Sequence, residues 1–425
     1  MASPQTDDSR VRGLVQQAER AMSGGQRDEA KRLLAQAKAV EADHPLVLNA
    51  EGVQQLNGGD TVVARRLFER AIERDRGNPA FFVNLATTLR RLGEQSDELQ
   101  ALENALSLEP RHLLALLQKA SLLELQGNKR AAATVYRNAL ASIPPGAQVH
   151  ENLRQVLQKA VTAVRENNAA LEAFLNEKVA TARSQHTGED LSRFDHCLDT
   201  VVAKRPIYIP APTYLAFPKL PAYEFYPRRE FPWLAEIEAA SAEIRTEFER
   251  VFIEDSERLE PYIRYPQGVP LDQWAELNHS KRWSVFYLWR DGRRIEDAIA
   301  RCPRTAELFE KVPKVDISGT GPTCFFSILA PGAHIPPHTG VTNARVIVHV
   351  PLVIPPGCEF RVGSETRQWE FGKAFVFDDT IEHEAWNRSD VPRAVLIFDV
   401  WNPYLTAAER DLVRATVEGM QEYNA

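Results

Sequence analysis

Small and large residues recur along the first third of the chain at a fixed spacing. A step of 34 residues brings four blocks into register, starting near positions 11, 45, 79 and 113. Glycine permits a tight turn, a small residue lets two helices approach closely, and a large residue fills the gap to the next pair. The pattern therefore predicts four helical hairpins. Its columns are Gly25, Gly59, Gly93 and Gly127; Ala18, Gly52, Ala86 and Ala120; Ala37, Ala71, Ala105 and Ala139; and the large residues Leu34, Phe68, Leu102 and Tyr136.

These columns resemble the tetratricopeptide repeat over residues 11–146, with four units. The resemblance implies an all-α solenoid whose concave surface binds a peptide or a partner protein and has no chemistry of its own. Amphipathic helices without a repeat are the alternative interpretation. Residues 149–186 keep the helical period but lack the columns, which predicts one or more helices that cap the array.

The composition of the chain changes after residue 205. Seven prolines stand among aromatic residues in the 27 positions from Pro206 to Pro232, so neither a helix nor a central strand can persist there. The apolar content predicts a segment that packs onto the following domain. We expect a flexible N-terminus at 1–10, the repeats at 11–146, a helical cap and connector at 147–205, and a second domain at 206–425.

The second half of the chain is rich in short runs with the composition of β-strands. Gly, Pro and Asp or Asn separate these runs, which predicts an antiparallel jelly roll, or double-stranded β-helix, with flanking helices. A helix is predicted at 234–253. The strand-like runs occupy 282–289, 323–330, 344–354, 358–363, 365–371, 373–379, 382–386 and 393–401.

The run that begins at Ala344 has ionisable residues on one face. Alternation places Arg345, Ile347 and His349 on that face and three valines on the other. If the first face points inwards, the cost of burying an unpaired charge predicts a bound anion. If it points to solvent, the residues carry no functional meaning.

Two histidines stand where metal ligands are expected. His338 lies just before the 344–354 run, and His383 follows the 373–379 run. Imidazoles that reach one point from distant strands are typical of non-haem iron enzymes. Many iron oxygenases carry a carboxylate two residues after the first histidine, but here that position is Gly340. The sequence therefore predicts a metal site without the usual third ligand.

An arginine and a serine complete the candidate site. Arg393 opens an apolar strand ten residues after His383, and a buried guanidinium there needs a carboxylate partner. A 2-oxoglutarate molecule supplies one, because its keto-acid end chelates iron and its distal carboxylate needs a bidentate cation. Ser327 can add a hydroxyl to the same carboxylate.

The motifs "PHTG", "FDD", "EHEAW" and "DVW" resemble the catalytic domain of the aspartyl/asparaginyl β-hydroxylases, and of the wider family that includes bacterial lipid A hydroxylases, over residues 205–410. The resemblance implies a dioxygenase that uses Fe(II), 2-oxoglutarate and O2. It also implies roles by position: His338 and His383 as metal ligands, Asp379 as the acid that holds a water in the place of a third ligand, Ser327, His349 and Arg393 around 2-oxoglutarate, and Arg345 and Trp283 beside the substrate.

One departure from the family leaves the substrate open. The family often carries an arginine two residues before the position of His349, where this chain has Ile347. The leading interpretation is hydroxylation of the β-carbon of an Asp or Asn residue in a polypeptide that the repeat array helps to engage. One alternative is the same chemistry on a free amino acid, a small peptide or a lipid. Another is a repeat-domain adaptor whose jelly roll is inactive.

A cupin of another class, such as an isomerase, is a further alternative. Such cupins use a close His-x-His pair and a nearby glutamate. The chain offers only His334, four residues before His338, and we interpret His334 as a loop histidine.

Composition narrows the partners. The chain has 51 Lys and Arg against 58 Asp and Glu, without a basic run of the kind that follows a phosphate backbone, so a nucleic-acid partner is not expected. We find no signal peptide and no apolar span long enough to cross a bilayer, and expect a cytoplasmic protein. The four cysteines are far apart, which predicts reduced, mostly buried thiols.

Overall fold

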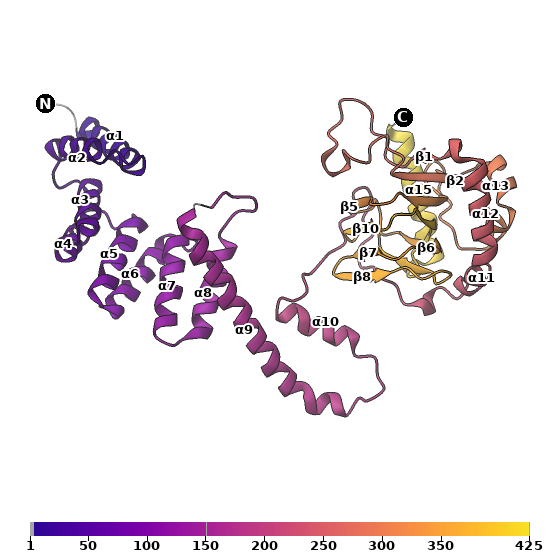
Figure 1. Ribbon diagram of the computed structural model, residues 1–425, viewed down its shortest axis with the longest axis horizontal. Coiled ribbons are helices and arrows are strands. Elements are labelled where there is room, and N and C mark those ends of the chain that lie inside the picture. Colours follow the sequence, from indigo (N-terminus) through magenta and orange to yellow (C-terminus); the bar gives the residue numbers. More distant parts are fainter. Residues whose placement is uncertain (1–3, 150, 425) are drawn as a thin grey trace. The chain divides into compact units, whose positions relative to one another are not determined.

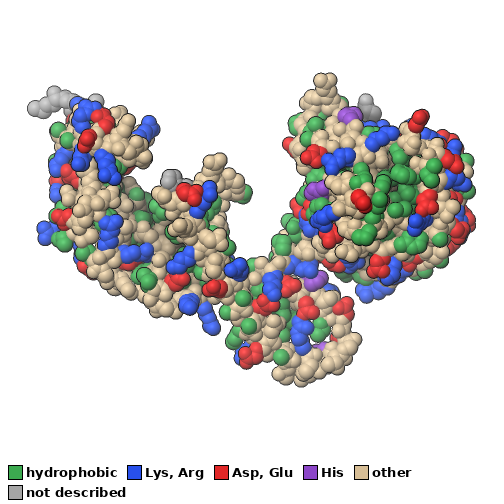
Figure 2. Space-filling model, in the orientation of Figure 1, with side chains coloured by type: hydrophobic (Ala, Val, Ile, Leu, Met, Phe, Trp, Pro, Cys, Tyr) green, Lys and Arg blue, Asp and Glu red, His purple; other side chains and the backbone are tan. Residues whose placement is uncertain are grey.

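The computed structural model describes residues 4–149 and 151–424. Two compact units divide between Ala203 and Lys204, and each is considered by itself (Figure 1). On the face shown in Figure 2, the basic and acidic side chains of both units lie among one another. None of the helices in the described part of the chain is long and apolar enough to cross a membrane.

The first unit consists of helical hairpins that follow the 34-residue period. The turn glycines Gly25, Gly59, Gly93 and Gly127 all have positive φ angles, and the predicted alanine and large-residue columns are buried. The predicted repeats are therefore confirmed as four helix pairs. The pairs are α1 (Pro4–Ser23) with α2 (Arg27–Val40), α3 (Pro45–Gly58) with α4 (Thr61–Arg74), α5 (Pro79–Leu92) with α6 (Gln95–Leu108), and α7 (Leu113–Leu125) with α8 (Lys129–Ala141).

A long helix closes the array. Helix α9 (Glu151–Ser184) packs against α8 through Leu153, Leu157 and Ala160, which join the apolar cluster around Tyr136. A short helix, α10 (Ser192–Val201), follows. Helix α9 lies where the sequence predicts a capping helix.

The stretch at 1–10, which the sequence predicts to be flexible, is helical in the residues that the structure describes. Helix α1 already begins at Pro4. Asp8 pairs with Arg12 at 2.8 Å, one turn along the helix, and with His44 at 3.0 Å, while Val11 is fully buried. The Asp8–His44 pair joins the beginning of α1 to the residue that precedes α3. Residues 1–3 lie outside the described residues.

The second unit contains two antiparallel sheets, as the strand runs predict, and neither closes into a barrel. The larger has the strand order β1-β2-β4-β11-β6-β9, with β3 beside β2, and the smaller has the order β5-β10-β7-β8. The strands are β1 (Glu260–Pro261), β2 (Trp283–Arg290), β3 (Arg293–Arg294), β4 (Cys324–Leu329), β5 (His334–His338), β6 (Arg345–Val353), β7 (Cys358–Val362), β8 (Glu365–Gln368), β9 (Phe375–Phe377), β10 (His383–Asn387) and β11 (Arg393–Trp401).

Apolar layers cover both faces of the larger sheet. One layer packs against helices α11 (Leu234–Ala239), α12 (Ser241–Glu254), α13 (Glu296–Arg301) and α14 (Pro303–Glu310). The other lies between the two sheets. Val346, Val348 and Val350 of β6 face the helices, so the face with Arg345 and His349 points between the sheets. Helix α15 (Ala407–Asn424) and the short helices η1 (Arg228–Glu230), η2 (Ser256–Arg258) and η3 (Asp272–Trp274) complete the unit.

The proline-rich segment packs onto the second unit, as predicted. The Ala211 amide donates to the Thr380 carbonyl and the Tyr226 amide to that of Val376. The Phe217 amide donates to the Asn343 side chain at 2.7 Å. These separate hydrogen bonds fix the backbone of the segment. The prolines prevent a longer strand or helix there, because proline has no N–H to donate.

Candidate functional site

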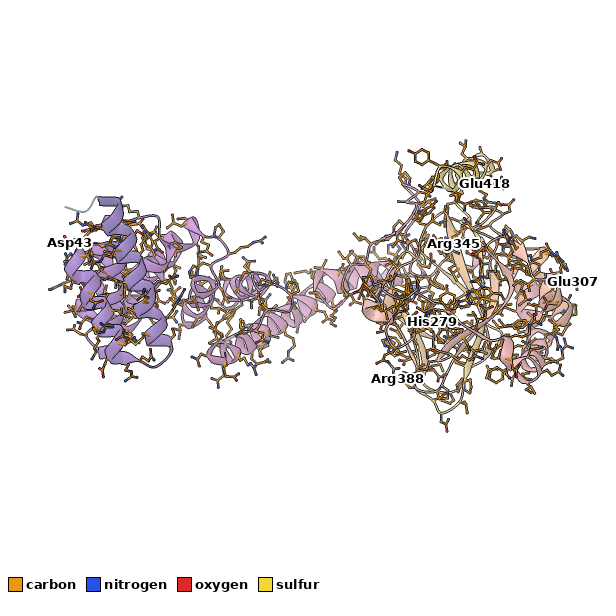
Figure 3. All side chains as sticks on the ribbon, turned by 90° about the horizontal axis from the view of Figure 1, so that it is seen from above. Asp43, His279, Glu307, Arg345, Arg388 and Glu418 are labelled. Carbon is orange, nitrogen blue, oxygen red and sulfur yellow. The ribbon has the colours of Figure 1, made fainter. Side chains whose placement is uncertain are left out.

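A cavity of about 670 Å³ lies between the two sheets, within the range of about 300–1,000 Å³ common for ligand pockets. It is lined by every residue to which the sequence assigned a site role: Trp283, Ser327, His338, Arg345, His349, Asp379, His383 and Arg393. Figure 3 shows Arg345 among the strands of this unit, with Glu307, Arg388 and Glu418 at its periphery. The face of β6 whose direction the sequence left open therefore points into the cavity.

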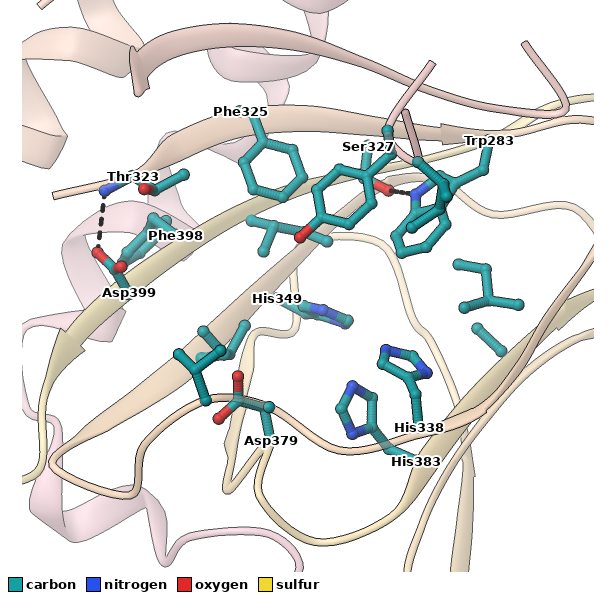
Figure 4. A pocket seen from close by; sticks show the side chains of 18 of the residues that line it. Trp283, Thr323, Phe325, Ser327, His338, His349, Asp379, His383, Phe398 and Asp399 are labelled. Carbon is teal, nitrogen blue, oxygen red and sulfur yellow. Dashed lines mark hydrogen bonds between the residues drawn. The ribbon is translucent and has the colours of Figure 1, made fainter. Parts of the chain in front are cut away.

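The two candidate metal ligands are side by side on neighbouring strands. His338 of β5 and His383 of β10 are paired in register, with ring centroids 4.0 Å apart (Figure 4). The Nδ1–H of His338 donates to the Pro336 carbonyl at 2.8 Å, and that of His383 to the Ile381 carbonyl at 3.0 Å. Both Nε2 lone pairs are therefore free to bind a metal.

A register shift sets the direction of His338. The pairing of β5 with β10 is irregular between His383 and Ala385, so Ile335 and His338 both line the cavity although they are three residues apart. An extra residue in one strand turns its side chains to the other face. Strand β5 itself was not predicted, because Pro336 and Pro337 argue against a central strand, and it lies at the sheet edge where proline is tolerated.

Burial keeps both metal-ligand candidates neutral. It lowers the pKa of His338 and lowers the pKa of His383 well below its ordinary value, and the neighbouring His338 adds to the second shift. Metal binding requires the neutral imidazole. These side chains therefore do not need to lose a proton at neutral pH before they can bind a cation.

Asp379 occupies the space beside Gly340. A Cβ atom at position 340 would lie 2.1 Å from Asp379 Oδ2, so no side chain fits there while Asp379 keeps its place. Burial, the largest cause, raises the pKa of Asp379 to about 6, although Arg345 lowers it. Within the described residues, no group of three or more His, Cys, Asp or Glu side chains is arranged to hold a metal. The protein therefore offers two histidines and a nearby carboxylate.

Arg393 is buried at the start of β11 without an acidic partner. Its side chain is 1% exposed, and no Asp or Glu of residues 4–149 and 151–424 pairs with it. It lies over the Trp369 ring, 4.7 Å from the centroid, and its Nη1 is 3.5 Å from Ser327 Oγ. Burial lowers its pKa to about 10. An unpaired buried guanidinium is costly, which indicates that an anion belongs in this end of the cavity.

Ser327 and His349 are oriented by two tryptophans. Trp283 Nε1–H donates to Ser327 Oγ at 3.1 Å, so the serine proton remains available to a ligand. Trp369 Nε1–H donates to His349 Nδ1 at 3.3 Å, which places the proton of the neutral imidazole on Nε2. Burial lowers the pKa of His349 well below its usual value, and Arg393 adds to this shift.

The sequence did not single out three residues of the site. Trp369 lies in the 365–371 run, which predicts a strand but no site role. Trp274, whose ring centroid is 5.0 Å from that of His338, ends the short helix η3. Asp399 belongs to the "DVW" motif and bonds to Arg345 at 2.7 Å, a contact that only the pairing of β6 with β11 creates.

His334 is not a loop histidine. It begins β5, where its Nε2 lies 2.9 Å from Glu384 and its ring stacks on Trp386. It does not line the cavity. The spacing of four residues from His338 does not bring the two imidazoles together, because the irregular pairing turns His338 inwards.

The second unit is a double antiparallel sheet whose cavity holds two neighbouring histidines, and the comparisons bear on the family of this domain. Residues 238–403 match the family model described as aspartyl/asparaginyl beta-hydroxylase. The chain is 43% identical over 145 residues to the aspartyl/asparaginyl beta-hydroxylase of Homo sapiens. These aligned residues cover 34% of this chain and 19% of the human protein. The family resemblance predicted from the motifs is confirmed for this domain.

The name of a second curated relative specifies a lipid as its substrate. The ornithine lipid ester-linked acyl 2-hydroxylase of Rhizobium tropici is 35% identical over 197 residues, which cover 46% of this chain and 66% of that one. The chain thus spans less than two thirds of either relative. Among solved structures, the Arabidopsis OM64 TPR domain is similar at 18% identity over 29% of this chain and 96% of that one, with a TM-score of 0.26, too low to support a conclusion.

Proposed function

We propose that the protein is an Fe(II)- and 2-oxoglutarate-dependent dioxygenase that hydroxylates the β-carbon of an Asp or Asn residue in a polypeptide. The observation that carries the proposal is the cavity that joins two free imidazole Nε2 atoms to a buried arginine without a carboxylate partner. A dicarboxylic keto acid fits both ends, because one end chelates a metal and the other meets the guanidinium.

The residues of the cavity have separate tasks in this proposal. His338 and His383 would hold Fe(II) through Nε2, and Asp379 would accept a hydrogen bond from a water on the metal. Arg393 and the hydroxyl proton of Ser327 would hold the distal carboxylate of 2-oxoglutarate, while His349 Nε2–H would donate towards its keto-acid end. When bound, iron and 2-oxoglutarate supply the activation of O2, with succinate and carbon dioxide as by-products.

The neutral histidines and the apolar surroundings support this arrangement. The wall of the cavity includes Phe360, Phe377 and Ile397, which are buried. A dry wall strengthens the interaction of Arg393 with a carboxylate and excludes water from the reacting groups. The repeat array would help to engage the polypeptide, since such arrays present extended binding surfaces.

Anaerobic binding tests the metal and cosubstrate assignment. Fe(II) and 2-oxoglutarate affinity would be measured for wild type, His383→Ala and His334→Ala. We expect weaker metal binding only in His383→Ala, because His334 lies outside the cavity. Unchanged metal affinity in His383→Ala would sink the proposal.

A second candidate keeps the chemistry and changes the substrate to a lipid acyl chain, a free amino acid or a small peptide. The similarity to the Rhizobium tropici acyl 2-hydroxylase over 197 residues favours the lipid. Mass spectrometry that looks for the gain of one oxygen separates the candidates: turnover of acyl lipids but not of peptides would select the second. Formation of succinate from 2-oxoglutarate would exclude an inactive adaptor.

We also propose a cytoplasmic location. The four cysteines carry free thiols, and Cys302, Cys324 and Cys358 are buried, which suits a reducing compartment. Cell fractionation with thiol labelling tests this location, and a secreted, oxidised protein would contradict it.

A further inference from the structure

One guanidinium in the cavity faces two carboxylates. Arg345 Nη1 lies 2.7 Å from Asp399 Oδ2, and its Nη2 lies 3.5 Å from Asp379 Oδ2. The side chains of Asp399 and Asp379 are 1% and 9% exposed. In the described part of the chain, no other Lys or Arg pairs with either acid. The cluster is therefore neutral when one carboxylate holds a proton and negative when neither does.

This cluster is next to the metal-ligand candidates. Asp379 fills the space beside Gly340, two residues after His338, and Arg345 points into the same cavity. The next residue on that face of β6 is Ile347, which adds no charge. A substrate carboxylate at this place would meet two acids and one already paired arginine, and would lose its hydration without gaining an unpaired cation from the side chains around it.

The other arginines of the cavity do not change this balance. Arg393 lies at the end that suits the cosubstrate. Arg264 and Arg290 share Glu260, at 2.5 and 3.3 Å. Arg290 is seven residues beyond Trp283 on β2, which is about 23 Å along a strand. Arg290 is therefore too far along β2 to neutralise a substrate group that reacts beside His338, and Arg264 is already paired with Glu260.

Arg345 and Asp379 together offer a hydrogen-bond donor beside an acceptor. The 3.5 Å between Arg345 Nη2 and Asp379 Oδ2 is too long for a good hydrogen bond. A carboxamide has a carbonyl oxygen that accepts and an amino group that donates, and so matches an arginine N–H and a carboxylate oxygen together. A carboxylate can only accept.

We propose that the side chain hydroxylated by this protein is the uncharged carboxamide of asparagine and not the carboxylate of aspartate. The inference rests on the proposed function and sharpens it. Arg345 would donate to the carboxamide oxygen, and Asp379 would accept from its NH2 group. Asp399 would act as a positioning residue that offsets the charge of Arg345 and holds it in place.

Two degenerate peptide libraries, alike except for a central Asn or a central Asp, test the preference with the full-length protein. Peptides retained without oxygen, in the presence of Fe(II) and 2-oxoglutarate, report binding, and the gain of one oxygen after oxygen is admitted reports reaction. We expect about tenfold or greater enrichment of the Asn library in both readouts. An equal or greater yield from the Asp library overturns the inference but leaves the proposed function standing. Reaction with neither library overturns both.

Three variants assign the preference to the charge balance. Asp399→Asn removes one negative charge but keeps the shape of the side chain and an oxygen that can accept the hydrogen bond from the Thr323 amide, 3.1 Å from Asp399 Oδ1. Ile347→Arg adds a positive charge on the same face of β6. Each is expected to raise the Asp yield relative to the Asn yield. Asp255→Asn alters another buried Asp–Arg pair, with Arg301 at 2.8 Å, outside the cavity, and should leave the ratio unchanged. If Asp399→Asn fails to fold, Ile347→Arg decides, and an unchanged ratio there overturns the inference.

Discussion

At the scale of the residue, the site contains buried arginines without balanced carboxylate partners and buried histidines with lowered pKa values. Arg393 is buried without a carboxylate, and the guanidinium of Arg345 is shared by two acids. His338, His349 and His383 are held neutral by burial. Such arrangements are costly for folding alone, and their concentration in one cavity is typical of a functional site.

Replacing Arg393 should separate cosubstrate binding from metal binding. In Arg393→Met we expect 2-oxoglutarate affinity to fall by about 100-fold or more, because a charge-assisted pair is lost, while Fe(II) affinity stays near that of wild type. Isothermal titration measures both. Arg388→Met, which alters an exposed arginine, is the matched control.

The ligand-free stability of Arg393→Met offers an independent check. Removing an unpaired buried charge should leave the free energy of unfolding equal to or above that of wild type. If Arg393→Met binds 2-oxoglutarate with the affinity of wild type, the role given to Arg393 is contradicted.

Asp379 should make stability depend on pH in a defined direction. Its pKa in the folded protein is raised to about 6 from 3.8. The folded state therefore binds a proton between these values while the unfolded state does not. The free energy of unfolding of wild type should rise relative to Asp379→Asn as pH falls from about 7 to about 4, by up to about 3 kcal/mol. Urea unfolding at a series of pH values measures this difference, and a constant difference would contradict the raised pKa.

At the scale of the element, close approach decides where small residues are required. Gly52 in α3 has no room for a Cβ, which would lie 2.6 Å from the ring of the buried Phe68 in α4. Gly340 is required for a similar reason, because Asp379 fills its side-chain space. In both places glycine is required because a neighbouring side chain fills the space of a Cβ, and not because of the backbone angles of the glycine.

Gly52→Ala should therefore destabilise the first unit. We expect the free energy of unfolding to fall by about 1–3 kcal/mol, because an extra methyl overpacks a filled hairpin. Gly58→Ala in the same helix is the matched control, since nothing lies within 4 Å of its added Cβ, and it should raise stability by up to about 1 kcal/mol. Thermal and urea unfolding measure both, and equal effects of the two substitutions would contradict this account.

At the scale of the whole molecule, each unit has its own apolar core. The repeat helices contain separate buried clusters along the array, and the second unit has its layers on both sides of the larger sheet. Every residue of the candidate site belongs to the second unit. The proposed chemistry and the proposed role of the repeat array can therefore be tested separately by dividing the chain.

A fragment of residues 204–425 should fold and convert 2-oxoglutarate to succinate without a polypeptide substrate at a rate close to that of the full chain. If the repeat array helps to engage the polypeptide, the fragment should show KM for that substrate raised by about tenfold with kcat nearly unchanged, because the tethered binding surface is lost. Steady-state kinetics measures both, and an unchanged KM would remove the array from substrate binding.

The sequence by itself determined the repeat period, the alternating strands and the identity of the candidate ligands. These are local patterns, since helix pairs and strand faces follow from the spacing of small, apolar and polar residues. The motifs also sufficed to place His338, His383 and Arg393 in one domain.

Tertiary structure alone decided how these residues meet. The register shift beside β5 turns His338 inwards while His334 pairs with Glu384 outside, and an edge strand with two prolines escapes prediction from pattern. The pairing of β6 with β11 brings Asp399 to Arg345, and packing puts Asp379 in the place of a side chain at Gly340. Spacing along the chain does not encode such contacts, because they depend on strand register and on the volume left between two sheets.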